Sequence, residues 1–414
     1  MLVAAMALAA VFAAMPGGWP TAAVRGDSRA ELDERIAKAQ ERLREHRLDA
    51  LLLTTEANVR YFTGYHSSFW LSPTRPWFVI LPVSGLPTAV IPMIGIDAFA
   101  RTNVGEVVAW PSPRKGDDGV SELSAALGQV PFGSGHIGAE FGAEMTVRMP
   151  LLDLEKVKVR LASRGQKLVD GGDIIKQARL VKSTIEVAKI EATCQAQSAA
   201  YRDLPYLLTE GMSEVEVCNA VRRLFLQKGV DNSPYVICRS GPVAYSDIIG
   251  QPTERRLQAG DVLIVDSGSQ IDGYFCDFNR NFAVGPPAME VEEAYSQLYE
   301  ATEAALRVVK PGARFQDVYR SMAHTLNVTA EGGVGRMGHA VGLQLTEWPS
   351  IHPDEETVLE EGMVLAIEPS VQLPSGGGRV LVTEEEVVVT QTGCRLLTER
   401  APLKIPVTAA KAEL

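Results

Sequence analysis

Hydrophobic residues recur at helical spacing in three stretches of the chain, and each stretch begins with a Ser followed three residues later by a Glu. Such a pair forms a capping box, in which both side chains satisfy free backbone amides at a helix start. The three pairs are Ser28 with Glu31, Ser183 with Glu186, and Ser213 with Glu216. The helices are expected to reach about Arg47, Leu208 and Gly229. The apolar stripe of the first helix consists of Leu32, Ile36, Ala39 and Leu43.

Short runs with strand character follow the first helix, and Gly and Pro residues separate them. These runs are residues 50–54, 77–81 and 88–91. Because helical and strand-like segments alternate, the sequence predicts an α/β domain that extends to roughly residue 170.

Two pairs of strands are predicted further along the chain, with helices near residues 291–309 and 314–326 between them. The pairs are 261–267 with 274–284, and 363–371 with 379–390. The sequence therefore predicts three segments. They are an apolar leader or disordered extension at 1–26, an N-terminal α/β domain at 27–172, and a C-terminal domain at 173–410.

The first strand pair carries two aspartates among apolar residues. Asp266 and Asp277 are separated by the dipeptide Asp272-Gly273, which favours a tight hairpin turn. The midpoint between the two aspartates falls close to this turn, at Ile271 and Asp272. We therefore expect the two carboxylates to lie opposite each other, with Cβ atoms roughly 4.5–5.5 Å apart.

The second strand pair carries two glutamates in the same way. Glu368 and Glu384 have their midpoint at Gly376, the first residue of a Gly-Gly-Gly turn. These two acids are also expected to face each other across a hairpin. The alternative is that the run Glu384-Glu385-Glu386 lies on a solvated edge.

His339 stands apart from the other five histidines because small residues flank it in the segment Gly338-His339-Ala340-Val341-Gly342. Such residues let a backbone or a substrate approach closely. His324 falls on a predicted helix and His352 in a loop, where packing or surface roles are expected.

Four carboxylates and one imidazole in apolar surroundings indicate a metal site. Like charges this close do not both stay ionised without compensation, and divalent cations supply it. An oxygen-rich set of this kind favours Mn²⁺, with Zn²⁺, Co²⁺ and Fe²⁺ as alternatives. Two ions about 3.5–4 Å apart are able to share such carboxylates. The predicted ligands are Asp266, Asp277, His339, Glu368 and Glu384.

Composition narrows the class of protein. The 414 residues predict two domains, and a charged fraction of 22% is normal for a globular chain. The net charge of −11 argues against a nucleic-acid partner. The five cysteines are scattered without a CxxC pair, which argues against a disulfide scaffold or a zinc–thiolate site.

Residues 1–14 are apolar but too short to span a bilayer as a helix. They resemble the core of a signal peptide cleaved near Ala22–Ala23, although the first basic residue is Arg25. A cytoplasmic location is expected because the cysteines look reduced, and export is the alternative.

Several motifs together resemble the creatinase/Xaa-Pro aminopeptidase family of prolidase-like metallopeptidases with a pita-bread fold. Asp266-Ser267-Gly268, followed by Asp277, is similar to its D-x-G…D motif, and the segment around His339 to its G-H-x-x-G. The segment Gly362–Pro369 is similar to G-M-x-x-x-x-E-P, and Glu384 precedes Thr390 as in E-x-x-x-V-V-T.

This resemblance implies a creatinase-type N-terminal domain and a pita-bread domain with a curved antiparallel sheet and flanking helices. It implies that Asp277 and Glu384 bridge two ions, and that Asp266 binds one ion while His339 and Glu368 bind the other. It assigns to Glu368 the transfer of a proton from the attacking water to the leaving nitrogen. It also implies a homodimer, in which a loop such as 66–71 walls the partner's pocket.

The sequence departs from the family pattern at two positions that usually hold histidines, where Ile249 and Thr346 stand instead. Val382 also replaces a common arginine, for which Arg379 is a possible substitute. The main hypothesis is an Xaa-Pro aminopeptidase or dipeptidase. The alternatives are a metal-dependent hydrolase or lyase of a small non-peptide metabolite, and a catalytically silent binding module. The five retained ligand positions argue against the silent module.

Overall fold

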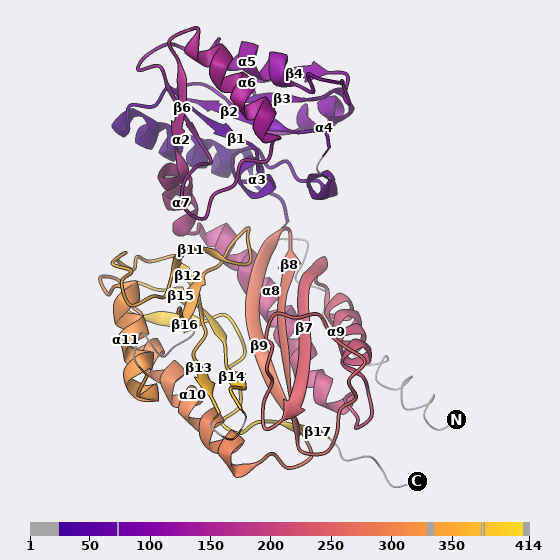
Figure 1. Cartoon of the computed structure of the whole chain (residues 1–414). Coiled ribbons are helices and arrows are strands. Elements are labelled where there is room, and N and C mark those ends of the chain that lie inside the picture. Colours follow the sequence, from indigo (N-terminus) through magenta and orange to yellow (C-terminus); the bar gives the residue numbers. More distant parts are fainter. Residues whose placement is uncertain (1–24, 73, 329–334, 374, 376, 409–414) are drawn as a thin grey trace.

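The computed structural model describes residues 25–72, 74–328, 335–373, 375 and 377–408. The chain forms two bodies joined near α7 and α8, as Figure 1 shows. The expected leader at residues 1–26 lies almost entirely outside the described residues. Among those that are described, no helix is both long enough and apolar enough to cross a membrane.

The N-terminal body is a six-stranded mixed sheet with helices on both faces. Its strand order is β4-β3-β2-β1-β5-β6, with β1–β2 and β2–β3 antiparallel and the other pairs parallel. The strands are β1 Ala50–Leu53, β2 Phe78–Pro82, β3 Thr88–Pro92, β4 Glu106–Trp110, β5 His136–Ala139 and β6 Lys167–Asp170. The helices are α2 Arg29–Glu45, α3 Glu56–Thr63, α4 Ile96–Phe99, α5 Val120–Leu127, α6 Leu151–Ala162 and α7 Gly172–Leu180. The predicted α/β character is confirmed.

The predicted apolar stripe of α2 is buried at all four positions. The capping box expected at Ser28 forms only in half. Ser28 accepts a hydrogen bond from the Glu31 amide at 3.1 Å, but the Glu31 carboxylate turns away. It accepts instead from Arg35 at 2.8 Å and from the Ser183 hydroxyl at 2.7 Å. A tertiary contact with the start of the next body has therefore replaced a local cap.

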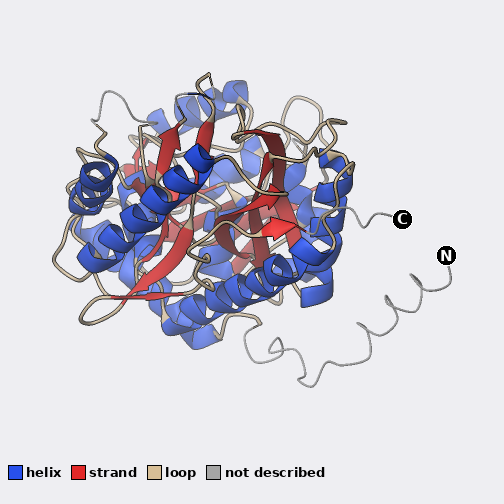
Figure 2. Cartoon of the chain, turned by 90° about the horizontal axis from the view of Figure 1, so that it is seen from below, coloured by secondary structure: helices blue, strands red, loops and turns tan. Residues whose placement is uncertain are grey.

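The C-terminal body has two main sheets whose outer sides are covered by helices, as Figure 2 shows from below. One sheet has the order β17-β9-β8-β7 and the other β11-β10-β12-β15-β16, with a separate pair β13-β14. The helices are α8 Thr184–Asp203, α9 Glu214–Lys228, α10 Met289–Val308 and α11 Phe315–Leu326. The first strands are β7 Asn232–Pro242, β8 Asp261–Ile271, β9 Tyr274–Val284, β10 Gly338–Ala340 and β11 Glu347–Ser350. The remaining strands are β12 Val364–Ile367, β13 Ser370–Gln372, β14 Val380–Val382, β15 Glu385–Val389, β16 Cys394–Leu396 and β17 Val407–Thr408.

The two later capping boxes form completely. The Ser183 hydroxyl accepts from the Glu186 amide while the Glu186 carboxylate accepts from the Ser183 amide, and Ser213 and Glu216 repeat this arrangement. Gly229 ends α9 in the left-handed conformation, with φ of 95°. These boxes fix where α8 and α9 begin, and both helices pack behind the sheet that carries Asp266 and Asp277.

The expected register of the first hairpin is wrong by two residues. Ile271 pairs with Tyr274, so that Asp266 lies opposite Asn279 and Asp277 lies opposite Gly268. The reason is that the turn contains only Asp272 and Gly273, which moves the centre of the hairpin. Since the shift is an even number of residues, both aspartates still point to the same face, as diagonal neighbours rather than as a direct pair.

The second hairpin has the predicted register. β12 pairs with β15 through Ile367 and Glu385, and β13 pairs with β14 through Ser370 and Val382. In both strand pairs the partner residues are symmetric about position 376, as expected, although residue 376 itself lies outside the described residues. Glu368 and Glu384 lie in the gap between the two strand pairs.

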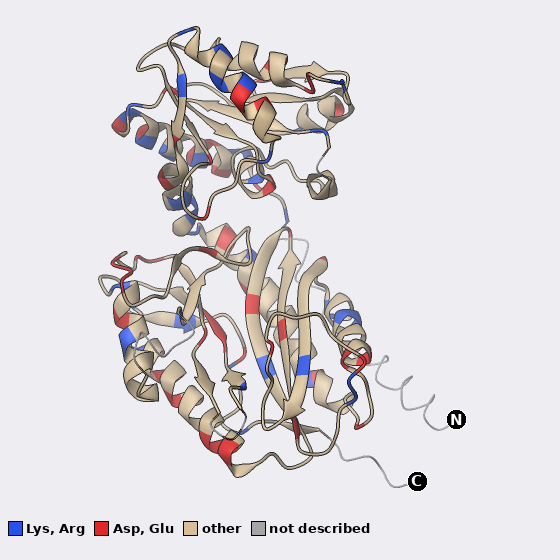
Figure 3. Cartoon of the chain, in the orientation of Figure 1, with Lys and Arg blue, Asp and Glu red and all other residues tan. Residues whose placement is uncertain are grey.

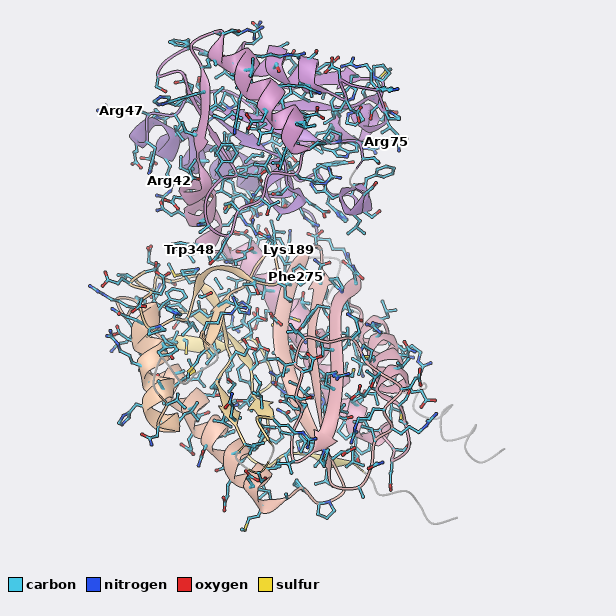
Figure 4. The ribbon with its side chains drawn as sticks, in the orientation of Figure 1. Arg42, Arg47, Arg75, Lys189, Phe275 and Trp348 are labelled. Atoms are coloured by element: carbon cyan, nitrogen blue, oxygen red, sulfur yellow. The ribbon has the colours of Figure 1, made fainter. Side chains whose placement is uncertain are left out.

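Buried charges hold the two bodies together. Lys189 on α8 contacts both Asp27 and Asp272 at 2.7 Å, and Arg60 on α3 contacts Asp272 at 3.0 Å. Lys189 is fully buried, and Figure 4 labels it at the junction of the two bodies together with Phe275 and Trp348. These contacts join the hairpin turn of β8 and β9 to the N-terminal body.

Candidate metal centre

A pocket of about 330 Å³ opens between the two sheets of the C-terminal body. It is lined by all five predicted metal ligands and by both positions at which histidines were expected. The lining residues are Tyr235, Ile248, Ile249, Asp266, Asp277, Arg336, His339, Leu345, Thr346, Glu368, Ser370, Val382 and Glu384. Two sheets distant in sequence therefore meet at the residues that the motifs singled out.

Asp277, His339 and Glu384 form the tightest group in this pocket. One side-chain donor atom from each lies within 4.8 Å of the others, and all three residues are buried. Asp277 comes from the middle of β9, His339 from β10, and Glu384 directly precedes β15. Asp266 and Glu368 line the same pocket around this group.

His339 is held with one ring nitrogen facing the group. Its Nδ1 donates a hydrogen bond to the carbonyl oxygen of Ala340 at 3.0 Å, which leaves the lone pair of Nε2 for the pocket. Nε2 lies 3.4 Å from Oδ2 of Asp277. Burial, helped by the charge of Arg336, lowers the pKa of His339 to about 4. The ring is therefore neutral at pH 7, and its contact with Asp277 joins two electron-pair donors rather than two opposite charges.

Asp266 has one satisfied and one unsatisfied oxygen. Oδ2 accepts a hydrogen bond from the Tyr235 hydroxyl at 3.0 Å, whereas Oδ1 is buried and has no partner within the described part of the chain. Burial raises the pKa of Asp266 to about 6, although the Tyr235 hydrogen bond opposes the rise. A buried carboxylate oxygen without a donor is suited to a cation.

Glu368 is half-buried at the end of β12, where its backbone amide donates to the Met337 carbonyl at 3.0 Å. Burial and then the charge of Asp266 raise the pKa of Glu368 to about 7. A carboxyl group with a pKa near the working pH is able to accept and return a proton.

The run Glu384-Glu385-Glu386 is not a solvated edge, because all three side chains are buried. Glu384 faces the pocket. Glu385 points to the opposite side, where it pairs with Arg280 at 2.9 Å and Arg400 at 3.0 Å. Glu386 accepts a hydrogen bond from the backbone amide of Asp277 at 2.7 Å, and so fixes the strand behind the site.

The charges of this site fit a divalent metal. Burial, followed by the mutual repulsion of the carboxylates, raises the pKa values of Asp277 and Glu384 well above their usual range. Figure 3 shows acidic residues in red along β8 and β9, away from the ends of these strands. Carboxylate oxygens and a neutral imidazole nitrogen are ligands that hold divalent ions, and such ions would relieve this repulsion.

Several residues that line the pocket were not singled out from the sequence, and Tyr235 and Arg336 are two of them. Tyr235 lies on β7, a third strand that the sequence analysis did not predict, and the run Tyr235-Val236-Ile237-Cys238 was its available signal. Arg336 precedes His339 by three residues, and no spacing rule marks it. Arg379 does not line the pocket; it donates instead to the Pro242 carbonyl at 3.2 Å.

The remaining candidates lie away from the pocket. His324 is on α11, as the helical pattern predicts. His352 follows β11, and its side chain is exposed to 44%. Neither contributes to the metal centre.

Comparison with known proteins matches both bodies of the chain to one kind of enzyme. Residues 188–391 match Metallopeptidase family M24, and residues 35–181 match the Creatinase/Prolidase N-terminal domain. An Xaa-Pro dipeptidase from Pyrococcus horikoshii is 28% identical over 377 residues, which cover 89% of this chain and 97% of that protein.

Solved structures show the same similarity. Dipeptidase PepE from Mycobacterium ulcerans superposes with a TM-score of 0.79 at 28% identity, over 92% of this chain and 99% of that one. A recombinant prolidase from Thermococcus sibiricus gives a TM-score of 0.80 at 25% identity, over 91% of this chain and 99% of that one.

Proposed function

Because the chain belongs to the creatinase/prolidase-like branch of Metallopeptidase family M24, and is thus a metal-dependent hydrolase, we propose that it cleaves the peptide bond before proline as an Xaa-Pro dipeptidase or aminopeptidase. The observation that carries this proposal is the convergence of Asp277, His339 and Glu384 within 4.8 Å. The relatives named Xaa-Pro dipeptidase and prolidase support the choice of bond.

We propose that Asp266, Asp277, His339, Glu368 and Glu384 together hold two divalent ions. The crowding of four carboxylates in one pocket supports two ions, because two divalent cations carry the charge needed to balance four carboxylates. Mn²⁺ is the proposed metal because oxygen ligands predominate, with Zn²⁺, Co²⁺ and Fe²⁺ as competitors. When bound, the ions lower the pKa of water and polarise the substrate carbonyl.

The protein's own groups have distinct tasks in this proposal. Glu368, which lines the pocket beside Asp266, accepts the proton of the attacking water and returns it to the leaving nitrogen. His339 keeps its lone pair directed inward because Nδ1 is tied to the backbone. Tyr235 orients the carboxylate of Asp266 through its hydroxyl.

The alternative of a small-metabolite hydrolase or lyase is less favoured by the comparisons, since the similar proteins are named as peptidases. Its motivation is still visible in the pocket wall. Ile249 is exposed to 75% and has no polar side-chain atom, and Thr346 offers a hydroxyl, so neither supplies the imidazole expected there, whose ionisation lies near neutral pH.

The test is hydrolysis by the Mn²⁺-loaded protein of Ala-Pro, of Ala-Pro-Ala, and of Ala-Ala as the matched substrate without proline. Release of alanine from the proline substrates, absent in the Glu368→Gln variant, is the expected result. Turnover of metabolites in a parallel panel, with all peptides intact, would instead establish the alternative.

Three further points accompany this proposal. We propose a homodimer, supported by the exposure of Phe69 at 37% and Leu71 at 87% in the loop expected to reach a partner. Sedimentation velocity of the wild type and of the Leu71→Asp variant tests it. We keep the boundary between residues 172 and 173 as the proposed domain limit; it falls at the start of α7, a helix that packs against α2 of the N-terminal body. We also propose a cytoplasmic location.

A further inference from the structure

A chain of buried polar contacts runs from the N-terminal body to the turn at residues 341–346, which follows His339. We propose that Asn58, on α3 of the N-terminal body, is a positioning residue of the peptidase reaction, which acts through Arg179 and Glu347 on this turn. This inference rests on the proposed peptidase function and adds to it a task for the N-terminal body. The three side chains lie outside the set that lines the pocket of the metal centre.

The turn connects β10, which carries His339, to β11, which begins with Glu347. Leu345 and Thr346 of this turn line the pocket, so the position of the turn sets one wall of the site. Ala340 pairs with Glu347 across the two strands, and the register shifts between His339 and Ala340. A displacement at the start of β11 would therefore move both the pocket wall and the strand that carries His339.

The carboxylate of Glu347 holds the backbone of this turn. Its Oε1 accepts a hydrogen bond from the backbone amide of Gln344 at 3.1 Å. A Cβ placed on Gly342 would lie 2.6 Å from the same oxygen, so the carboxylate rests directly against the backbone. The side chain is buried and pairs with two cations, Arg179 and Lys182, the latter at 3.2 Å. The place of the carboxylate, and with it the turn, thus depends on the cations that hold it.

Arg179 divides its hydrogen-bond donors between the two bodies. It lies on α7, a helix that packs against α2 and also contacts β11. Its Nη2 donates to Oε1 of Glu347, whereas its Nη1 donates to Oδ1 of Asn58 at 2.7 Å. Because the guanidinium is rigid and planar, the acceptor at Nη1 fixes the direction from which Nη2 approaches the carboxylate.

The amide of Asn58 has only one orientation that satisfies its neighbours. A guanidinium can only donate, so the amide oxygen faces Arg179 and the amide nitrogen faces Glu140. That nitrogen donates to Oε1 of Glu140 at 2.6 Å and to Oγ1 of Thr55 at 3.0 Å. Glu140 is 1% exposed and also accepts from the backbone amide of Thr54 at 2.7 Å. A buried chain of paired groups favours one arrangement, because leaving any member unpaired is costly.

Removing the Asn58 amide should therefore change the site although no group in the pocket is altered. The buried Nη1 of Arg179 would lose its acceptor, and the guanidinium would reorient and shift the carboxylate of Glu347. A misplacement of about 1 Å is enough to lower a rate by about 10²-fold, so a smaller shift of the pocket wall is measurable. Asn58 thus serves the reaction through the position of other groups and without touching the substrate.

The kinetic experiment measures kcat/KM for Ala-Pro at pH 7 in Mn²⁺, at a temperature well below the melting midpoint of each variant. We expect Asn58→Ala to lower kcat/KM about 5- to 30-fold, mainly through kcat. Arg179→Lys should lose a similar factor, because an ammonium keeps the charge but cannot reproduce the fork that joins both acceptors. Thr55→Val is the matched control. It removes a hydrogen bond to Glu140 at the N-cap of α3 but leaves Arg179 and its two acceptors in place, so kcat/KM should stay within about twofold.

A double-mutant cycle separates positioning from a general loss of stability. In Glu347→Gln the charge that Arg179 directs is already gone, so the addition of Asn58→Ala should lower kcat/KM less than about twofold further. Independent losses, which multiply in the double variant, would overturn the proposal. An unchanged kcat/KM in Asn58→Ala would overturn it as well.

Hydrogen exchange of residues 341–347 provides a readout that does not depend on turnover. Because the Gln344 amide donates to Glu347, its exchange should become about 10-fold faster in Asn58→Ala and stay unchanged in Thr55→Val. Exchange at the wild-type rate in Asn58→Ala, or an equal acceleration in α10, overturns the proposal and leaves the peptidase function standing. If the wild type cleaves neither Ala-Pro nor Ala-Pro-Ala, the peptidase function fails, and hydrogen exchange alone judges whether Asn58 positions the turn.

Discussion

Nε2 of His339 lies 3.4 Å from Oδ2 of Asp277, although the two residues belong to strands of different sheets. Both atoms carry electron pairs at pH 7, because burial keeps the ring neutral. Two electron-pair donors this close do not attract each other, so the contact does not stabilise the metal-free protein. Together with Glu384 they are suited to share a bound cation.

Replacing either residue should therefore remove metal and activity together. We expect His339→Gln and Asp277→Asn to lose at least one bound ion per chain and to lower kcat/KM by about 10³-fold or more. Metal content by mass spectrometry after gel filtration, followed by Ala-Pro hydrolysis, measures both effects. His352→Gln is the control, since that exposed side chain lies outside the pocket. Full metal content in Asp277→Asn would contradict its assignment as a ligand.

Glu384→Gln should have opposite effects on the metal-free and metal-loaded protein. Without metal, the change removes one of several buried carboxylates that repel each other, so the free energy of unfolding should rise by about 1–3 kcal/mol. With Mn²⁺, the variant should gain less thermal stability than the wild type, because the stabilisation by a bound ion grows with the logarithm of its affinity. Paired melting curves in EDTA and in Mn²⁺ test this. A lower Tm of the variant in EDTA would argue against carboxylate crowding.

The ion pairs of Glu347 should make stability depend on pH. Although burial opposes the shift, Arg179 and Lys182 lower the pKa of Glu347 to about 2, from an ordinary value of 4.5. The carboxylate therefore stabilises the fold above about pH 4.5, and this stabilisation is lost as the pH falls toward 2.

At pH 7 we expect Glu347→Gln to lower the free energy of unfolding by on the order of 3 kcal/mol. The difference from the wild type should begin to shrink below about pH 4.5. Urea unfolding between pH 7 and about pH 3 follows this difference. A constant difference across this range would show that the ion pairs with Arg179 and Lys182 do not shift the titration of Glu347.

Two glycines at the site should differ in their tolerance of alanine. A Cβ at Gly338 would lie 2.1 Å from the backbone oxygen of Ala366, and its φ of +132° disfavours a side chain. A Cβ at Gly268 would lie 2.0 Å from Cδ1 of Leu345, the far end of a flexible side chain. Gly338→Ala should therefore cost about 3 kcal/mol or more, and Gly268→Ala about 1 kcal/mol. The urea concentrations at the unfolding midpoints of the two variants test this order. An equal loss of stability in both variants would contradict it.

The sequence alone determined the local features that depend on short-range chemistry. The capping boxes at Ser183 and Ser213 formed as predicted, because both partners lie within one helical turn. The register of Glu368 and Glu384 followed from a symmetric hairpin around a glycine turn. The motif around His339 also indicates the family, because it is a short segment that needs no tertiary contact to be read.

The tertiary structure decided everything that depends on which surfaces meet. A two-residue turn moved Asp266 away from direct opposition to Asp277, and a contact between bodies drew Glu31 from its cap to Ser183. The approach of β10 to β9 and the placement of Arg336 beside Thr346 arise from the packing of two sheets. Side chains distant in the chain acquire their distances only through such packing, and no periodicity or spacing in the sequence encodes those distances.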